Sequence, residues 1–357
     1  MRRVSVAHAK PGMVLGRAVY DIRGQMVLNE RESLTEDNVG LLARSGAAEI
    51  LIEDPRVADV PVGALYPADL EAKALQAIHV LLVLKQGSSD SLAPGELLGV
   101  QPAVHQMVGR LFPTPLGDPD LSGTSSLQAY DYIHPVKVTG LALLIGRTAG
   151  LGKEDLFKLG MAAMLQNIGN LWLPPGLLEK PGPFGEDELK QIRKHPEYGV
   201  EMLPNSGLDA ETIRAVEQHH ERWAGSGYPR GLKANEISPF AQIIALADTY
   251  HSLMSARPHR KAFQPHEAVE FIIAFSGDLF DPELTQFFAR RIPQYPAGLA
   301  VKLSTGEVGI VSDPNVGHIA RPIVRICYEA GRQVPHPYDL DLSESQCMTK
   351  LIVEVVL

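Results

Sequence analysis

Apolar residues recur at helical spacing from residue 127 to about residue 290, and this pattern limits the fold more than any other feature of the chain. Within residues 127–148, His134, Val138, Leu141 and Ile145 follow one another at steps of four, three and four, so they share one helix face. Similar segments follow, including a strongly apolar one at residues 240–255. The pattern predicts a mainly α protein whose residues 127–290 form an all-helical bundle of about six to eight helices.

Both flanks of this bundle carry strand patterns. The pattern of residues 1–58 predicts a small N-terminal α/β domain with a helix that begins after Thr35 and ends at Gly46. We expect this domain to have a sensory or docking role. Residues 59–126 predict helix followed by a linker rich in Pro, Gly and Ser. Residues 291–357 predict a small C-terminal β-rich subdomain.

The composition limits the function. The chain has 357 residues, a net charge of −9 and a pI of about 5.8. This acidic balance argues against a nucleic-acid polymer as partner, because such binding uses a basic surface. The two cysteines, Cys327 and Cys347, are too few for a disulfide framework. No apolar run approaches the ~20 residues of a membrane span, and we expect a cytoplasmic protein.

Asp248 is the first residue that suggests chemistry, because it lies on the apolar face of the helix predicted for residues 240–255. A buried carboxylate without a partner costs several kcal/mol or becomes protonated, and a nearby metal or other cation removes that cost. Backbone donors or an arginine would do the same, and for an isolated Asp this is the commoner explanation. His134 poses a similar choice, since a histidine on an apolar face is more often a core residue.

Three further histidines favour a metal site. His219 and His220 are adjacent, and neighbouring ligands converge only near a helix end, which the glycines that follow indicate. His195 precedes Pro196, at a position typical of a helix start. Histidine and aspartate side chains that point inward from several helices suit a mixed nitrogen and oxygen site for a transition metal.

The sequence here resembles the HD-GYP domain family. The resemblance rests on residues 218–232, QHHERWAGSGYPRGL, and on the Asp-containing helix and Arg-Pro-x-Arg segment within residues 243–261. The segments LEKPG at 178–182 and KHPEYG at 194–199 are similar to the family as well. Together these motifs cover about residues 127–290, nearly half of the chain, in the family's order and spacing.

The resemblance implies an HD-type bundle that hydrolyses cyclic di-GMP with two or three iron or other divalent ions. It implies a set of metal ligands: His134, His195, His219, His220 and Asp248. It implies a ligand-binding set that contacts the dinucleotide: Tyr228, Arg257, Arg260 and Lys261. In the family, the loop that corresponds to Gly227, Tyr228 and Pro229 is linked to substrate handling and to docking of GGDEF domains.

Several positions depart from the family. Gln166 and Asn167 stand where its His-Asp pair is expected, and Asn170 stands where a lysine is expected. Tyr130 replaces a glutamate ligand of some members, and Ala224 replaces the aspartate usual before the loop. The lost aspartate bridges two metals in the family, and two dications ~4 Å apart repel by roughly 16 kcal/mol at an effective dielectric of 20. We therefore expect no catalytic residue at these positions, and one divalent metal (iron, manganese or zinc) or none instead of a full di-iron site.

Three hypotheses follow. The first is a degenerate HD-GYP protein in cyclic di-GMP signalling, a pseudoenzyme that binds ligand or docks GGDEF-type or other signalling proteins. The alternative is an active or weak metal-dependent cyclic di-GMP phosphodiesterase with a reduced metal site at His195, His219 and His220. The third is a scaffold without metal or nucleotide. The signal sensed by residues 1–58 and the oligomeric state, with a homodimer as one option, stay open.

Overall fold

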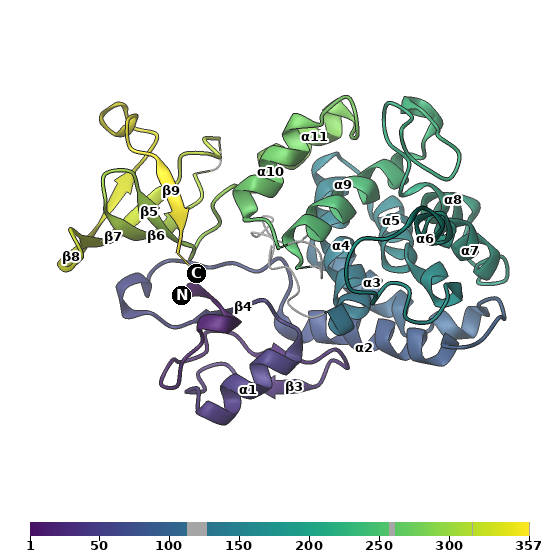
Figure 1. The fold of residues 1–357 in the computed structure, drawn as a ribbon, viewed down its shortest axis with the longest axis horizontal. Coiled ribbons are helices and arrows are strands. Elements are labelled where there is room, and N and C mark those ends of the chain that lie inside the picture. Colours follow the sequence, from purple (N-terminus) through teal and green to yellow (C-terminus); the bar gives the residue numbers. More distant parts are fainter. Residues whose placement is uncertain (113–126, 257–260, 316, 357) are drawn as a thin grey trace.

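The computed structural model describes residues 1–112, 127–256, 261–315 and 317–356. Figure 1 shows the N-terminal unit and the C-terminal sheet on one side of the molecule and the helical bundle on the other. The molecule is mainly α with a small C-terminal β subdomain, as predicted. No helix in the described ranges is both long and apolar enough to cross a lipid bilayer.

The N-terminal unit combines short strands with one helix. Its elements are β1 (Arg2–Ser5), β2 (Val19–Tyr20), β3 (Met26–Leu28), α1 (Glu36–Ser45) and β4 (Glu49–Ile52). The capping predicted for α1 is confirmed: the Thr35 side chain accepts a hydrogen bond from the Asn38 backbone, and Gly46 ends the helix with a left-handed φ of 86°. The strand β1 was not predicted, and it pairs antiparallel with β4.

The helical part contains ten helices within the described residues. They are α2 (Ala68–Lys85), α3 (Val100–Arg110), α4 (Leu127–Thr148), α5 (Lys153–Leu165), α6 (Glu186–Ile192), α7 (His195–Met202), α8 (Ala210–Gln218), α9 (Pro239–Met254), α10 (Pro265–Ala274) and α11 (Pro282–Arg291). The face predicted for α4 is confirmed, because Val138, Leu141 and Ile145 are all buried beside His134. One hydrophobic core runs from α2 to α11, so α2 and α3 share the core of the bundle.

The C-terminal residues form one antiparallel sheet. Its strands are β5 (Ala300–Leu303), β6 (Val308–Asp313), β7 (Ile323–Glu329), β8 (Arg332–Asp341) and β9 (Ile352–Val355), in the order β8-β7-β6-β5-β9. The strand β8 was not predicted, because Pro335 and Pro337 interrupt its strand pattern. It lies at the edge of the sheet, where proline is tolerated.

The N-terminal unit and the sheet contact each other directly. Arg3 donates its backbone N–H to Gly298 and its Nε to Ala297, the two residues that lead into β5. Arg56 donates to the Tyr328 hydroxyl of β7 at 2.9 Å. The two ends of the chain therefore pack together on the same side of the bundle (Figure 1).

Candidate functional site

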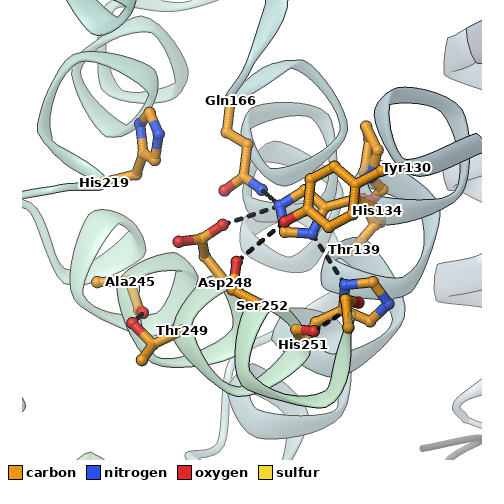
Figure 2. A network of polar contacts seen from close by, with 12 residues as sticks. Tyr130, His134, Thr139, Gln166, His219, Ala245, Asp248, Thr249, His251 and Ser252 are labelled. Atoms are coloured by element: carbon orange, nitrogen blue, oxygen red, sulfur yellow. Dashed lines mark hydrogen bonds and ion pairs between the residues drawn. The ribbon is translucent and has the colours of Figure 1, made fainter. Parts of the chain in front are cut away.

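The first polar cluster forms where α4 and α9 pack together. His134 on α4 donates its Nε2–H to Oδ1 of Asp248 on α9 at 2.8 Å (Figure 2). Both side chains are buried. Burial by itself raises the pKa of an aspartate, but the hydrogen bond from His134, together with the electrostatic influence of His134, His220 and His219, outweighs it and holds the pKa of Asp248 below its usual range. Asp248 is thus a charged carboxylate with a direct partner, and that partner is a histidine.

Further side chains from the same helices extend this cluster. His134 Nδ1 lies 2.9 Å from Nδ1 of His251, so one of the two rings donates to the other. Tyr130 stacks on His134 with ring centroids 4.4 Å apart, and its hydroxyl lies 2.9 Å from that of Ser252. Both ring nitrogens of His134 therefore have protein partners. Figure 2 shows His219 outside this network of dashed contacts.

Gln166 joins the cluster from the end of α5. Its side chain is fully buried, and its Nε2 lies 3.2 Å from Nε2 of His134. Its Oε1 makes no hydrogen bond to any residue of the described ranges. An amide offers a donor at one end and an acceptor at the other and carries no charge. Gln166 therefore completes the polar surroundings of His134 without adding a charge.

Asn167 and Asn170 face a different space. Together with Asp131 they line a cavity of about 90 Å³ whose other walls are mainly apolar. This segment packs tightly against α7, because a Cβ added at Gly169 would lie 2.0 Å from the carbonyl oxygen of His195. The glycine therefore permits the close approach that carries His195 to the end of α5. The cavity therefore adjoins Asn167 and Asn170, two of the positions at which the sequence departs from the family.

The second polar cluster is a group of three histidines. His195 begins α7, His219 caps the C-terminus of α8, and His220 follows it. One ligand atom from each ring can be chosen so that the three atoms lie within 4.8 Å of one another. These are the histidines whose positions at helix ends suggested convergence from the sequence.

The hydrogen bonds of this histidine triad fix which nitrogens are available. His195 Nδ1 donates to the Ile192 carbonyl at 2.8 Å, and His219 Nδ1 donates to the Val216 carbonyl at 2.7 Å. Each neutral ring therefore carries its proton on Nδ1 and a lone pair on Nε2, and the two Nε2 atoms lie 3.3 Å apart. Two facing lone pairs without a proton between them repel, and a shared cation removes that repulsion. Ring N–H groups bonded to backbone carbonyls are also typical of metal-bound histidines.

Electrostatics keeps the triad neutral. Burial, together with the neighbouring His195, lowers the pKa of His219 to about 3. Burial lowers the pKa of His195, and burial with the adjacent His219 lowers the pKa of His220 well below its usual range. The rings are therefore unprotonated at neutral pH, which is the form that binds metals. The donor set, three neutral imidazoles, fits one divalent transition metal with an open position.

Glu221 holds the loop that follows the triad. Its carboxylate is buried and accepts hydrogen bonds from the backbone N–H groups of Arg230, at 2.7 Å, and Leu232, at 3.0 Å. Both of its oxygens are thus used by the loop. The sequence placed this residue beside the histidines, but only the structure shows that it closes residues 221–232 into a compact turn.

Gly227 and Tyr228 seat this loop against the triad. A Cβ at Gly227 would lie 2.4 Å from the Arg222 nitrogen and 2.5 Å from the His220 carbonyl oxygen, so only glycine fits. Tyr228 stacks on His220 with ring centroids 4.8 Å apart, and the Arg193 guanidinium lies 5.5 Å from the Tyr228 centroid. Arg193 is exposed. The aromatic ring thus connects the histidine triad to a surface cation.

The predicted phosphate contacts are only partly described. Arg257 and Arg260 lie outside the described residues, and Lys261 is exposed. Arg193 was not predicted as a contact residue. The sequence held no signal for it, because its place beside Tyr228 depends on how α6 and α7 pack against the loop.

Comparison with known proteins gives a consistent result. A family model described as "HD domain" matches residues 118–284. A cyclic di-GMP phosphodiesterase of Pseudomonas aeruginosa is 32% identical over 213 residues, which cover 58% of this chain and 50% of that protein. A cyclic di-GMP phosphodiesterase response regulator of Xanthomonas campestris is 36% identical over 156 residues, 43% of this chain and 41% of that protein. These matches support a place for the chain in the HD-GYP family.

The residues that match the HD domain model, 118–284, contain both polar clusters. The chain spans about half the length, or less, of these two curated relatives. A solved HD-GYP-type protein of Bdellovibrio bacteriovorus aligns with 80% of this chain and 97% of its own length, at 15% identity and a TM-score of 0.47. His251 is the buried site residue that the sequence analysis missed, because its partner His134 lies 117 residues away.

Proposed function

We propose that this chain is a degenerate HD-GYP protein in cyclic di-GMP signalling. In this proposal it binds one divalent metal at most and acts by binding ligand or docking a partner, not by efficient hydrolysis. The proposal joins two features of the site: a polar cluster around His134 that is bonded internally, and a separate histidine triad that suits a metal.

The contacts of His134 carry the proposal. Nε2 bonds to Asp248 and Nδ1 to His251, so both lone-pair directions of the ring are used within the protein. Gln166 lies against the same Nε2 and supplies no charge. A second dication close to the triad would need a bridging anion to offset the repulsion, and the amide of Asn167 supplies none.

The triad would hold the single metal. His195, His219 and His220 would be its ligands, and a bound ion would supply Lewis acidity at the open position. The protein's own part is orientation: the Ile192 and Val216 carbonyls fix two of the rings, and Glu221 fixes the loop behind the third.

The ligand that fits this proposal is cyclic di-GMP. The two curated relatives carry that dinucleotide in their names. The chain is acidic overall, so its binding surface needs local cations. Arg193 beside Tyr228 and Lys261 are exposed and suited to phosphates, and we propose Arg257 and Arg260 with them. Tyr228, with Gly227 and Pro229, would also form the docking loop for a GGDEF-type partner.

A weak metal-dependent phosphodiesterase is the second candidate. The observation that favours it is the open position of a three-histidine site, which is the arrangement of several catalytic zinc centres. This candidate requires turnover with one metal and without the cation that Asn170 replaces.

Metal analysis and nucleotide assays on one purified sample test the proposal. We expect about one metal per chain, measurable binding of cyclic di-GMP by calorimetry, and no linear product formation by chromatography. Two metals per chain with turnover would overturn it.

A matched variant separates the two candidates. His219→Gln removes a triad ligand while retaining size and polarity. If a low hydrolysis rate is found and disappears with the metal in His219→Gln, the second candidate is correct. If dinucleotide binding persists in His219→Gln without any hydrolysis in either protein, the first is supported.

A further inference from the structure

We propose a ligand site for a compact neutral amide group in the cavity that Asn167 and Asn170 line. The cavity has a volume of about 90 Å³ and lies between α2, α4 and the 3₁₀ helix η4 (Ile168–Trp172). The ligand group carries a carbonyl and an N–H side by side, as in a primary amide or in the lactam edge of a guanine base. The guanine source rests on the function proposed above, whereas the amide-binding chemistry does not.

The two asparagine side chains have unused hydrogen-bonding capacity. Asn167 stands at the N-cap of η4, where an asparagine side chain commonly accepts a backbone N–H, yet it makes no such bond. Asn170 donates its backbone N–H to the Asn167 carbonyl at 3.0 Å, and its own carbonyl accepts from Leu173 at 3.1 Å. Within the described residues, neither side-chain amide has a hydrogen-bond partner. Both residues are half-buried and line the cavity, so their amides are available to a molecule that enters it.

The charges on the walls favour a neutral group over an anion. Asp131 is the one charged residue among the described residues that line the cavity, and it is a carboxylate. An anion would gain no cation from these walls and would be repelled by Asp131. The two amides offer donors and acceptors without a charge, so they match a group that also offers both.

An asparagine side chain and an amide ligand are complementary at two atoms each. Oδ1 accepts from the ligand N–H while Nδ2 donates to the ligand carbonyl, and the second asparagine can meet the remaining donor or lone pair. The other walls, including Ile78, Leu82 and Leu171, are apolar. A ligand of the same shape without the N–H would leave a polar atom unpaired against these walls, so the site discriminates against it.

The size of the cavity limits the group to a few atoms. An engineered apolar cavity of about 150 Å³ accommodates benzene, so a volume of about 90 Å³ suits about four heavy atoms. A small primary amide such as acetamide has this size. A complete guanine base is too large, so its lactam edge would enter while the rest of the base stays outside.

The cavity adjoins the histidine triad through a close backbone contact. Gly169 lies between the two asparagines in the sequence, and a Cβ added there would lie 2.0 Å from the His195 carbonyl oxygen. The asparagines therefore belong to a segment that packs directly on the start of α7, where His195 begins the triad. A guanine base of a dinucleotide bound at the triad is thus one source of the amide group, and a free small amide is the other.

Titration of the full chain with acetamide, acetone and acetate, which are equal in size, tests the proposal. Nuclear magnetic resonance follows the side-chain amide signals of Asn167 and Asn170. We expect both signals to shift and saturate with acetamide at millimolar concentration. Acetone and acetate should bind at least about fivefold more weakly, because neither has the N–H donor and acetate is also repelled. Equal affinities for the three molecules, or no shift with acetamide, would rule out the proposal.

A matched pair of leucine variants locates the site. Leu82→Phe fills the cavity from α2 without changing a polar group and should abolish acetamide binding. Leu84→Phe makes the same change on the exposed side of α2 and should bind acetamide as the native chain does. Asn170→Leu removes one amide and should weaken acetamide about fivefold or more. Thermal melts check folding. If Asn170→Leu is unfolded, the leucine pair decides, and native acetamide affinity in Leu82→Phe rejects the cavity as the site.

Cyclic di-GMP titrated into the same variants distinguishes the two sources. If a guanine edge enters the cavity, Leu82→Phe should weaken cyclic di-GMP at least about fivefold relative to Leu84→Phe. If Leu82→Phe loses acetamide but retains native affinity for cyclic di-GMP, the occupant is a free small amide. If the native chain binds acetamide and no cyclic di-GMP, the proposed function fails while the amide site stands.

Discussion

His195 and His219 face each other through their Nε2 atoms at 3.3 Å, while the Nδ1 of each ring bonds to the carbonyl three residues earlier. These bonds fix both tautomers, so two lone pairs meet in a buried space. His134 differs, because its Nε2 donates to Asp248 and its Nδ1 is shared with His251. One group of histidines is therefore arranged so that it could hold a cation, and the other is paired within the protein.

This contrast predicts different effects of one substitution at two positions. His219→Gln should lower metal affinity by more than about 100-fold, since it removes a direct ligand of a site where even outer partners matter 10- to 100-fold. His134→Gln should leave the metal content unchanged, because glutamine can still donate to Asp248. Elemental analysis after dialysis measures both. Loss of metal in His134→Gln would contradict the division into two clusters.

The pH dependence of stability is the second prediction. His219 has a pKa of about 3 in the folded protein, against about 6.5 for an unfolded chain. Between these values the unfolded chain binds the extra proton, so stability falls as pH is lowered through this window. The loss is about 1.4 kcal/mol per pH unit for one such histidine. His195 and His220 act in the same direction.

Chemical denaturation of the metal-free protein from pH 7.5 to 5 checks this dependence. His219→Gln should reduce the slope of unfolding free energy against pH by about the contribution of one histidine. The exposed His105, replaced by glutamine, is the control and should leave the slope unchanged. An unaltered slope in His219→Gln would show that the ring is protonated in the folded state.

Local signals allowed much of the fold to be predicted. Thr35 and Gly46 mark the ends of α1 because capping depends only on residues close in sequence. The strand β8 was not predicted, because Pro335 and Pro337 obscure its strand pattern. Its position at the edge of the sheet, where proline is tolerated, depends on tertiary structure. Helix ends, which depend on neighbouring residues, could therefore be predicted from the sequence, whereas strand pairing between distant residues could not.

The site shows the same division. The position of His219 and His220 at a helix end predicted that the pair could converge, because neighbouring side chains within a helix point apart. The approach of His195 depends on how α7 packs against α8. The partner of Asp248 was left open between a metal, backbone donors and an arginine, and in the structure His134 lies within hydrogen-bonding distance of its carboxylate. His251 was not considered, because nothing near it in the sequence requires a partner.

Glu221 provides the third prediction. It accepts two backbone N–H groups, so Glu221→Gln replaces one acceptor oxygen with an amino group that faces a donor. We expect a loss of about 1–3 kcal/mol in unfolding free energy. Metal affinity should fall as well, because the loop adjoins His220. The control is Glu217→Gln, whose partner Arg230 is largely exposed, and it should cost no more than about 1 kcal/mol. Equal losses in the two variants would show that the carboxylate has no special role in the loop.

The fourth prediction restores the residues that the family has at three positions. The triple variant Gln166→His, Asn167→Asp and Asn170→Lys adds one ligand, one bridging carboxylate and one cation. His134 must then exchange its contact with His251 or with Asp248 for a metal, which the buried carboxylate of Asp248 favours. We expect the metal content to rise from about one to about two per chain, with onset of cyclic di-GMP hydrolysis.

Two partial variants separate the effect of the lysine from that of the His-Asp pair. Asn170→Lys alone should add no metal, because it adds only a cation, and no ligand, beside the cavity that Asn167 also lines. Gln166→His with Asn167→Asp should raise the metal content without full activity, because the carboxylate offsets the repulsion between the ions. If the triple variant folds and still binds a single metal, Gln166 and Asn167 do not occupy the positions of the family's ligands, and the loss of charge there cannot explain an inactive site.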